Sequence, residues 1–214
     1  MPDSGHQSVS WSIRRVRRGD GQQLRALRLE ALRSAPTAFL ESYAAAERLD
    51  SAGWEARIER SRRAGRQTLI VGEHGGSWCG MLGAFVGAER DCDDFDLPDP
   101  PVLATQTWAM LWGMFVQPAA RGSGLADRLL AAVYAWAAQE AGVDWLGLDV
   151  LTTNAPAINL YCRNDFQFTT ATRPYPSDQG DSLVVMVRPI ESEGRVVPAD
   201  HGSLRPDWTG PNRV

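Results

Sequence analysis

Apolar residues recur along the chain at two spacings, which predicts a succession of helices and strands. Residues three or four positions apart are apolar from about Gln22 to Arg33 and again from Leu125 to Ala141, the spacing of amphipathic helices. Shorter helices are predicted at residues 43–48, 51–63 and 156–163. Apolar or alternating runs predict strands at residues 12–16, 68–73, 77–86, 107–116, 145–151, 166–172 and 182–188. This order of elements predicts a mixed α/β (α+β) fold.

Glycine and proline mark the boundaries of several of these segments. The turn His74-Gly75-Gly76 between two apolar runs predicts a β-hairpin. A break at Ala35-Pro36-Thr37 ends the first helix, and Gly142 is placed to end the long one.

Composition divides the chain into one domain and two flanking segments. We expect the domain at residues 12–189, after an N-terminal extension of residues 1–11 and before a polar tail of residues 190–214. Within the domain, residues 88–104 form a predicted loop insertion. Between Glu89 and Asp99 this insertion carries six carboxylates against a single arginine.

Overall composition excludes several classes of protein. Hydrophobic residues make up 43% of the 214, which suits a folded domain, and the formal net charge of -4 argues against nucleic-acid binding. The chain contains no apolar run of about 18 residues, so we expect no transmembrane helix. The N-terminus lacks the apolar stretch of a secretory signal. The three cysteines are widely spaced, so we expect no metal site and a reducing, cytoplasmic location.

The segment with the clearest chemistry joins an apolar strand to the long helix through two glycines. It comprises Val116-Gln117-Pro118-Ala119-Ala120-Arg121-Gly122-Ser123-Gly124-Leu125-Ala126. Glycines let backbone N–H groups converge, and a helix start adds unpaired N–H groups and the positive end of its dipole. This pattern predicts a site for a phosphate or pyrophosphate, although a plain strand-to-helix turn also requires glycine. The G-x-G-x-x-G and P-loop fingerprints of nucleotide-binding proteins do not fit.

A second motif follows the next strand and is more specific. Its residues are Leu146, Leu148, Val150, Asn154, Ala157, Leu160, Tyr161, Arg163 and Phe166. The two motifs have the forms V-x-P-x-x-R-G-x-G-x-A and L-x-L-x-V-x-x-x-N-x-x-A-x-x-L-Y-x-[KR]-x-x-F. In this order and at this separation they resemble the GCN5-related N-acetyltransferase (GNAT) family. The resemblance extends from about Ile13 to Val187.

The resemblance implies a fold, a cosubstrate and a set of contacts. The expected fold is a mostly antiparallel, twisted sheet flanked by helices, with two neighbouring strands splayed apart at the cofactor cleft. The expected cosubstrate is acetyl-CoA, whose pantetheine arm pairs with the backbone around Phe115 and Val116 and contacts Asn154. The pyrophosphate loop matches Arg121, Gly122, Ser123, Gly124, Leu125 and Ala126.

Two positions depart from the family pattern. Asp165 replaces the glycine that usually precedes the phenylalanine, and we expect the turn to survive because Asn and Asp tolerate the left-handed conformation. Residues 112–115 offer no glutamate of the kind that acts as a base in some members. Glu41 is the predicted alternative, since its segment lines the acceptor pocket in the family; the competing interpretation is a solvated surface charge.

The resemblance assigns the central catalytic role to Tyr161. It matches the tyrosine whose hydroxyl faces the thioester sulfur, so we expect it to protonate the departing thiol, help that contributes roughly 10²–10⁴-fold. Backbone N–H groups near Val116 are suited to stabilise the charge that develops on the carbonyl oxygen. Cys162 has no histidine beside it in the motif, so covalent catalysis is not expected.

These features predict direct, acetyl-CoA-dependent acetylation of a primary amine on a small molecule or a protein. The acidic segment at residues 89–99 favours a polycationic or ammonium-bearing acceptor, with a loop that serves solubility as the alternative. An inactive CoA-binding sensor or interaction module, and a nucleotide-binding module, are the competing function classes. The resemblance leaves a homodimer open, and we expect no nucleic-acid or membrane partner.

Overall fold

The computed structural model describes residues 10–87, 107–175 and 182–191. The predicted insertion at residues 88–104, Cys92, nearly all of the N-terminal extension and most of the C-terminal tail lie outside these ranges. In the described parts of the chain, no helix is long and apolar enough to cross a membrane.

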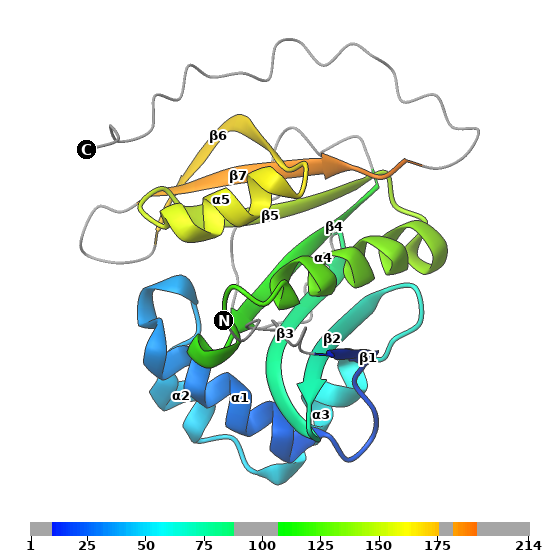
Figure 1. Cartoon of the computed structure of the whole chain (residues 1–214), viewed down its shortest axis with the longest axis vertical. Coiled ribbons are helices and arrows are strands. Elements are labelled where there is room, and N and C mark those ends of the chain that lie inside the picture. The colour runs from blue at the N-terminus through cyan, green and yellow to red at the C-terminus, as the bar shows by residue number, and fades with distance from the viewer. Residues whose placement is uncertain (1–9, 88–106, 176–181, 192–214) are drawn as a thin grey trace, which may run out of the picture.

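Seven strands form one sheet in the order β1-β2-β3-β4-β5-β7-β6 (Figure 1). All neighbouring strands are antiparallel except β4 and β5, which are parallel. The strands are β1 (Ser12–Arg15), β2 (Gln67–His74), β3 (Ser77–Val86), β4 (Trp108–Val116), β5 (Trp145–Leu151), β6 (Gln167–Pro174) and β7 (Ser182–Pro189). The helices are α1 (Gly21–Ser34), α2 (Tyr43–Glu47), α3 (Ser51–Arg60), α4 (Leu125–Trp136) and α5 (Ala155–Arg163), with short 3-10 helices η1 (Pro36–Ala38) and η3 (Pro118–Ala120).

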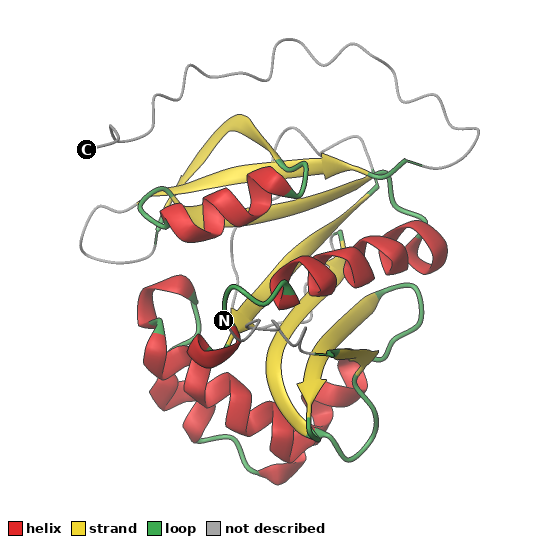
Figure 2. Ribbon diagram, in the orientation of Figure 1, coloured by secondary structure: helices red, strands yellow, loops and turns green. Residues whose placement is uncertain are grey.

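Helices cover both faces of the sheet because its inner strands are apolar on both sides (Figure 2). Along β2, Ile70 packs in one buried cluster with residues of α4 and α5, whereas its neighbours Leu69 and Val71 pack in another with residues of α1 and α3. On β3, Leu82 packs in the first of these clusters and Met81 in the second. The period of two along each strand therefore determines which helices lie on which face.

The sheet opens between β4 and β5. Their parallel register covers only Trp108–Met110 against Trp145–Gly147. Beyond Met110, β4 continues alongside β3 as far as Val116, and β5 continues alongside β7 to Leu151. The two strands diverge visibly in Figure 1. The predicted splayed pair of strands is therefore confirmed.

An extra residue in β4 accompanies this opening. Met81 and Gly83 of β3 pair with Phe115 and Trp112, so three steps along β4 face two steps along β3. This is a β-bulge, which bends the strand and strengthens its twist. Gly113 within it has a φ of 68°, a conformation that favours glycine.

The predicted elements are confirmed with small shifts at their ends. The third helix ends at Arg60 rather than at residue 63. The long helix is α-helical to Trp136, continues as a π-helical turn over Ala137–Ala141 and ends at Gly142, whose φ is 62°. Asp165 has a φ of 63°, so the turn without the usual glycine survives, as predicted.

Candidate active site

A cavity of about 170 Å³ lies at the opening between β4 and β5. Its wall combines residues of the bulged part of β4, of β5 and of α5 with residues of α1, the segment after η1 and the end of β6. The lining is mainly apolar, and Trp108 and Trp112 form part of it, as expected for core or pocket-wall tryptophans. The indole of Trp112 lies directly over Gly83, where a Cβ would collide with the ring.

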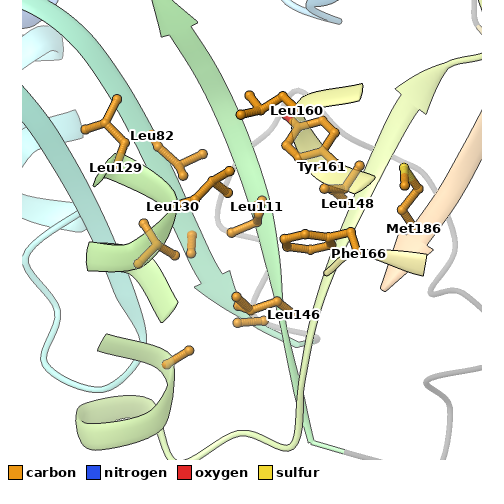
Figure 3. Close-up of a cluster of buried hydrophobic side chains, with 14 of the residues drawn as sticks. Leu82, Leu111, Leu129, Leu130, Leu146, Leu148, Leu160, Tyr161, Phe166 and Met186 are labelled. Atoms are coloured by element: carbon orange, nitrogen blue, oxygen red, sulfur yellow. The ribbon is translucent and has the colours of Figure 1, made fainter. Parts of the chain in front are cut away.

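Five residues of the second motif line this cavity, and the two with polar side chains are Asn154 and Tyr161; the others are Leu148, Val150 and Ala157. Asn154 is the N-cap of α5, and its Oδ1 accepts a hydrogen bond from the Ala157 N–H at 3.3 Å. The Tyr161 ring packs edge-on against Phe166, with the ring centroids 5.7 Å apart, among the buried side chains of Figure 3.

The surroundings of Tyr161 keep its hydroxyl protonated. The residue is 7% exposed, and burial raises its pKa well above the ordinary value of a tyrosine. None of the described residues hydrogen-bonds to this hydroxyl. A neutral phenol that borders a cavity is able to donate a hydrogen bond to a group bound there.

The glycine-rich loop holds its backbone open at the start of α4. Gly122 and Gly124 have φ values of 75° and 79°, and nothing lies within 4 Å of where a Cβ would stand on either. Ser123 Oγ donates to the Ala120 carbonyl oxygen at 2.6 Å, which stabilises the turn. Gly124 is the N-cap of α4 and has no side chain to bond the first N–H groups of the helix.

Leu125 fixes the position of this loop. Its side chain is 1% exposed and lies over Gly72 of β2 and Gly80 of β3, where a Cβ would press on it. Leu125 therefore offers only its backbone to a ligand, and half-buried Ala126 packs on the same core. None of the residues from Arg121 to Ala126 lines the cavity, so the structure places the predicted pyrophosphate loop apart from the predicted acid.

The backbone of Val116 faces the opening. Gln117 donates its N–H to the Cys79 carbonyl oxygen of β3 at 2.8 Å, and Val116 pairs with Gly80. In an antiparallel ladder this arrangement turns the N–H and C=O of Val116 away from β3. The carbonyl oxygen accepts a hydrogen bond from Arg121 Nε at 3.2 Å. Phe115, by contrast, pairs with Met81, and its side chain is buried on the α1 side of the sheet.

Glu41 is neither a surface charge nor a part of the cavity wall. The residue is 5% exposed, and its two carboxylate oxygens accept hydrogen bonds from Arg28 Nε at 2.9 Å and from an Arg57 terminal nitrogen at 2.6 Å. Burial favours a higher pKa, but the hydrogen bonds and positive charges of Arg57 and Arg28 outweigh it and lower the pKa of Glu41. The interpretation of Glu41 as a solvated charge is wrong, and its position outside the cavity wall does not favour its use as a base.

Charged side chains that the sequence analysis did not assign line the cavity: Arg28, Asp149 and Arg173. Arg173 of β6 bonds Asp149 of β5, with 3.2 Å between NH1 and Oδ2. Tyr175, after β6, also lines the cavity. A signal for Arg28 was present in the sequence, because it lies four residues after Leu24 and four before Leu32, on the buried face of α1.

The remaining candidates have no part in the cavity. Cys162 is an exposed residue, but its sulfur is partly shielded from water, and this partial burial raises the pKa of the thiol. A raised pKa does not favour a thiolate nucleophile. Within residues 10–87, 107–175 and 182–191, no group of three or more His, Cys, Asp or Glu side chains could hold a metal ion.

The residues present suit acetyl-CoA. An extended pantetheine chain needs an unpaired strand edge, which the Val116 N–H and the divergence of β5 provide. A pyrophosphate needs converging N–H groups without side chains above them, which the two left-handed glycines and the start of α4 provide. A thioester sulfur needs a neutral donor, which Tyr161 provides from the cavity wall.

Comparison with known proteins identifies the same family. A sequence profile described as "Acetyltransferase (GNAT) family" matches residues 28–166. None of the curated proteins compared matches the chain significantly.

Solved structures share the fold over most of the chain. An acetyltransferase of the GNAT family from Streptococcus pneumoniae superimposes with a TM-score of 0.67 at 17% identity, over 85% of this chain and 100% of that one. The YncA protein of Salmonella typhimurium, solved with acetyl-CoA, superimposes with a TM-score of 0.64 at 20% identity, over 89% of this chain and 99% of that one. Spermidine N-acetyltransferase from Vibrio cholerae, solved with CoA and spermine, superimposes with a TM-score of 0.61 at 14% identity, over 84% of this chain and 95% of that one.

The two motifs, the splayed strands and the profile match over most of the domain lead to one conclusion. The chain belongs to the GNAT family of acetyltransferases, and its cosubstrate is acetyl-CoA.

Proposed function

We propose that the chain transfers the acetyl group of acetyl-CoA directly to the primary amine of a small molecule bound in the cavity. The observation that carries this proposal is that Asn154 and Tyr161 meet the open edge of β4 in one cavity. When bound, acetyl-CoA supplies the acetyl thioester. The residues of the chain supply binding, orientation and a proton.

Each part of the site has a distinct role in this proposal. The N–H groups of Gly122, Gly124 and the first turn of α4 bind the pyrophosphate, and Arg121 adds a positive charge at the rim. The Val116 N–H binds the extended arm and orients the carbonyl group. The Tyr161 hydroxyl donates its hydrogen to the sulfur as the thiol leaves.

The shape of the cavity supports a small acceptor rather than a protein. Tyr175 and Phe39 both line it, and the Tyr175 hydroxyl donates a hydrogen bond to the Phe39 carbonyl oxygen at 3.1 Å. This bond connects the end of β6 to the segment after η1 across the cavity, which narrows the space that a polypeptide would need.

Asp149 replaces Glu41 as the proposed acceptor of the amine proton. Among the described residues it is the only carboxylate that lines the cavity. Asp149→Asn should lower kcat/KM most at pH values where the acceptor amine is protonated in solution, and least where it is already neutral. An equal loss at every pH would assign Asp149 a structural role through Arg173.

The experiment that tests the proposed function is release of free CoA thiol from acetyl-CoA with a panel of primary amines and peptides. Amine-dependent release, with N-acetylated product identified by mass spectrometry, would support it. Tight acetyl-CoA binding without release would favour the CoA-binding sensor instead. We keep a cytoplasmic location as part of the proposal, with free Cys79 and Cys162 suited to a reducing environment.

A further inference from the structure

The cavity reaches both faces of the sheet. On the face that α4 and α5 cover, the wall consists of side chains of one buried cluster: Leu82, Leu111, Leu148 and Tyr161 (Figure 3). Residues of the opposite face, the α1 side, also line the cavity, because β4 and β5 pair only as far as Met110 and Gly147. An amine on the α1 side can therefore reach a thioester beside Tyr161 through the opening.

The wall on the α1 side is aromatic. Alternation along β4 places Trp108 and Trp112 on the face opposite to Leu111. Phe85 of β3 lies on this face too, because it pairs with Met110. Together with residues that follow η1 and β6, the aromatic side chains of this half are Phe39, Phe85, Trp108, Trp112 and Tyr175. A wall of this kind favours an apolar ligand and, among apolar ligands, one with a ring.

Gly83 makes room for the tryptophan at the centre of this wall. The indole of Trp112 lies over Gly83, its partner across the strands, where a Cβ would collide with the ring. The tryptophan is half-buried and packs against the cluster that includes residues of α1 and α3. Any side chain at position 83 would displace the indole, so the shape of the aromatic wall depends on this glycine.

The charged side chains of the described wall have partners within the protein. Arg173 NH1 lies 3.2 Å from Asp149 Oδ2, and Arg28 Nε donates to Glu41 at 2.9 Å. A second ionic group on the ligand would lose its hydration among the rings and compete with an existing pair. With Asp149 as the proposed acceptor of the amine proton, the wall suits one amine on an otherwise apolar body.

We propose that the acceptor is an arylalkylamine, a primary amine on a short chain that carries an aromatic ring and no second charge. The cavity of about 170 Å³ matches this size, since a core cavity of about 150 Å³ can hold a benzene molecule. The ring packs against the aromatic wall, with Trp112 as a specificity-determining contact, and the amine reaches the thioester through the opening. This inference rests on the proposed function, because it assigns the acceptor of the same site.

The test is a series of amines in the thiol-release assay. Ethylamine and 2-phenylethylamine differ only in the phenyl group, 2-cyclohexylethylamine has a saturated ring, phenylalanine adds a carboxylate, and spermidine adds further cations. We expect kcat/KM for 2-phenylethylamine to exceed that for ethylamine roughly 30-fold or more, because the phenyl group leaves water. It should exceed the value for each other member several-fold. Equal or better turnover of any other member would overturn the inference and leave the proposed function intact, whereas absence of turnover with every amine would overturn both.

Two tryptophan variants separate the wall of the cavity from the stability of the core. Trp112→Leu should lower kcat/KM for 2-phenylethylamine roughly 10-fold or more and that for ethylamine far less, because the indole contacts only the larger acceptor. Trp78→Leu is the matched control, since Trp78 is a buried tryptophan of the cluster that Trp112 packs against but lies outside the cavity wall. Equal effects of the two folded variants, or equal losses for both amines, would contradict the proposal. If Trp112→Leu does not fold, the preference of the unmodified protein decides the matter.

Discussion

The hydroxyl of Tyr175 donates a hydrogen bond to the carbonyl oxygen of Phe39 at 3.1 Å, and it joins residues 136 positions apart in the chain. Tyr175 follows the edge strand β6, and Phe39 follows η1. Both residues line the cavity. This contact links the C-terminal part of the sheet to the helical segment that packs on its N-terminal part.

Loss of this hydrogen bond should weaken binding of the acceptor more than binding of acetyl-CoA. In Tyr175→Phe we expect KM for the acceptor to rise several-fold while the Kd for acetyl-CoA stays unchanged, because the Val116 edge and the glycine loop are untouched. The unfolding free energy should fall by about 1 kcal/mol, the usual net value of one hydrogen bond. Steady-state kinetics, calorimetry and urea unfolding measure these three quantities. A weaker Kd for acetyl-CoA with an unchanged acceptor KM would contradict the assignment.

The anion site at α4 is tested by a pair of glycine substitutions. Gly124→Glu places a carboxylate where the pyrophosphate meets the helix N-terminus, so we expect acetyl-CoA binding to be lost in calorimetry. Gly142→Glu is the matched control. Gly142 has a similar left-handed φ of 62° and also has nothing within 4 Å of a Cβ, but it lies after the opposite end of the helix. If both folded variants bind acetyl-CoA equally well, the loop is not the pyrophosphate site.

Glu41 should contribute to stability rather than to proton transfer. Breaking a buried ion pair typically costs about 3–5 kcal/mol, so Glu41→Gln should lower the unfolding free energy near neutral pH by that order. Glu59→Gln, which breaks exposed ion pairs with Arg18 and Arg62, should change it by only about 0.5 kcal/mol.

The contribution of Glu41 also has a definite pH dependence. Its folded-state pKa lies below the ordinary value of 4.5, so the stabilisation is fully present above that value and is lost as the pH falls through the folded-state pKa. The stability difference between the unmodified protein and Glu41→Gln should therefore shrink in acid. A difference that grows on acidification would mean that the carboxyl group is protonated in the folded protein.

The sequence was sufficient for the helices, the strands and their turns, because those features are local. Helical spacing placed Leu24 and Leu32 on a buried face, and paired glycines at residues 75 and 76 placed a hairpin. The tolerance of aspartate for a left-handed conformation anticipated the turn at Asp165.

The charged wall of the cavity depends on long-range contacts and was not predicted. Arg173 meets Asp149 although β7 lies between their strands, so strand order had to be known first. Burial of Glu41 depends on the packing of α1 against α3, which supplies its two arginines. The acidic segment at residues 89–99 lies outside the described residues, so its proposed attraction for cations stays a prediction.

Tyr161→Phe tests the central claim, acetyl transfer in the cavity with Tyr161 as proton donor, most directly. At saturating acceptor and acetyl-CoA, kcat for thiol release should fall by roughly 10²-fold or more, with the Kd for acetyl-CoA nearly unchanged, because the hydroxyl acts only as the sulfur gains charge. Tyr134→Phe is the control, since Tyr134 lies on α4 outside the cavity wall and should retain full activity. Tyr161→Phe with undiminished kcat in single-turnover measurements, where product release plays no part, would contradict the account.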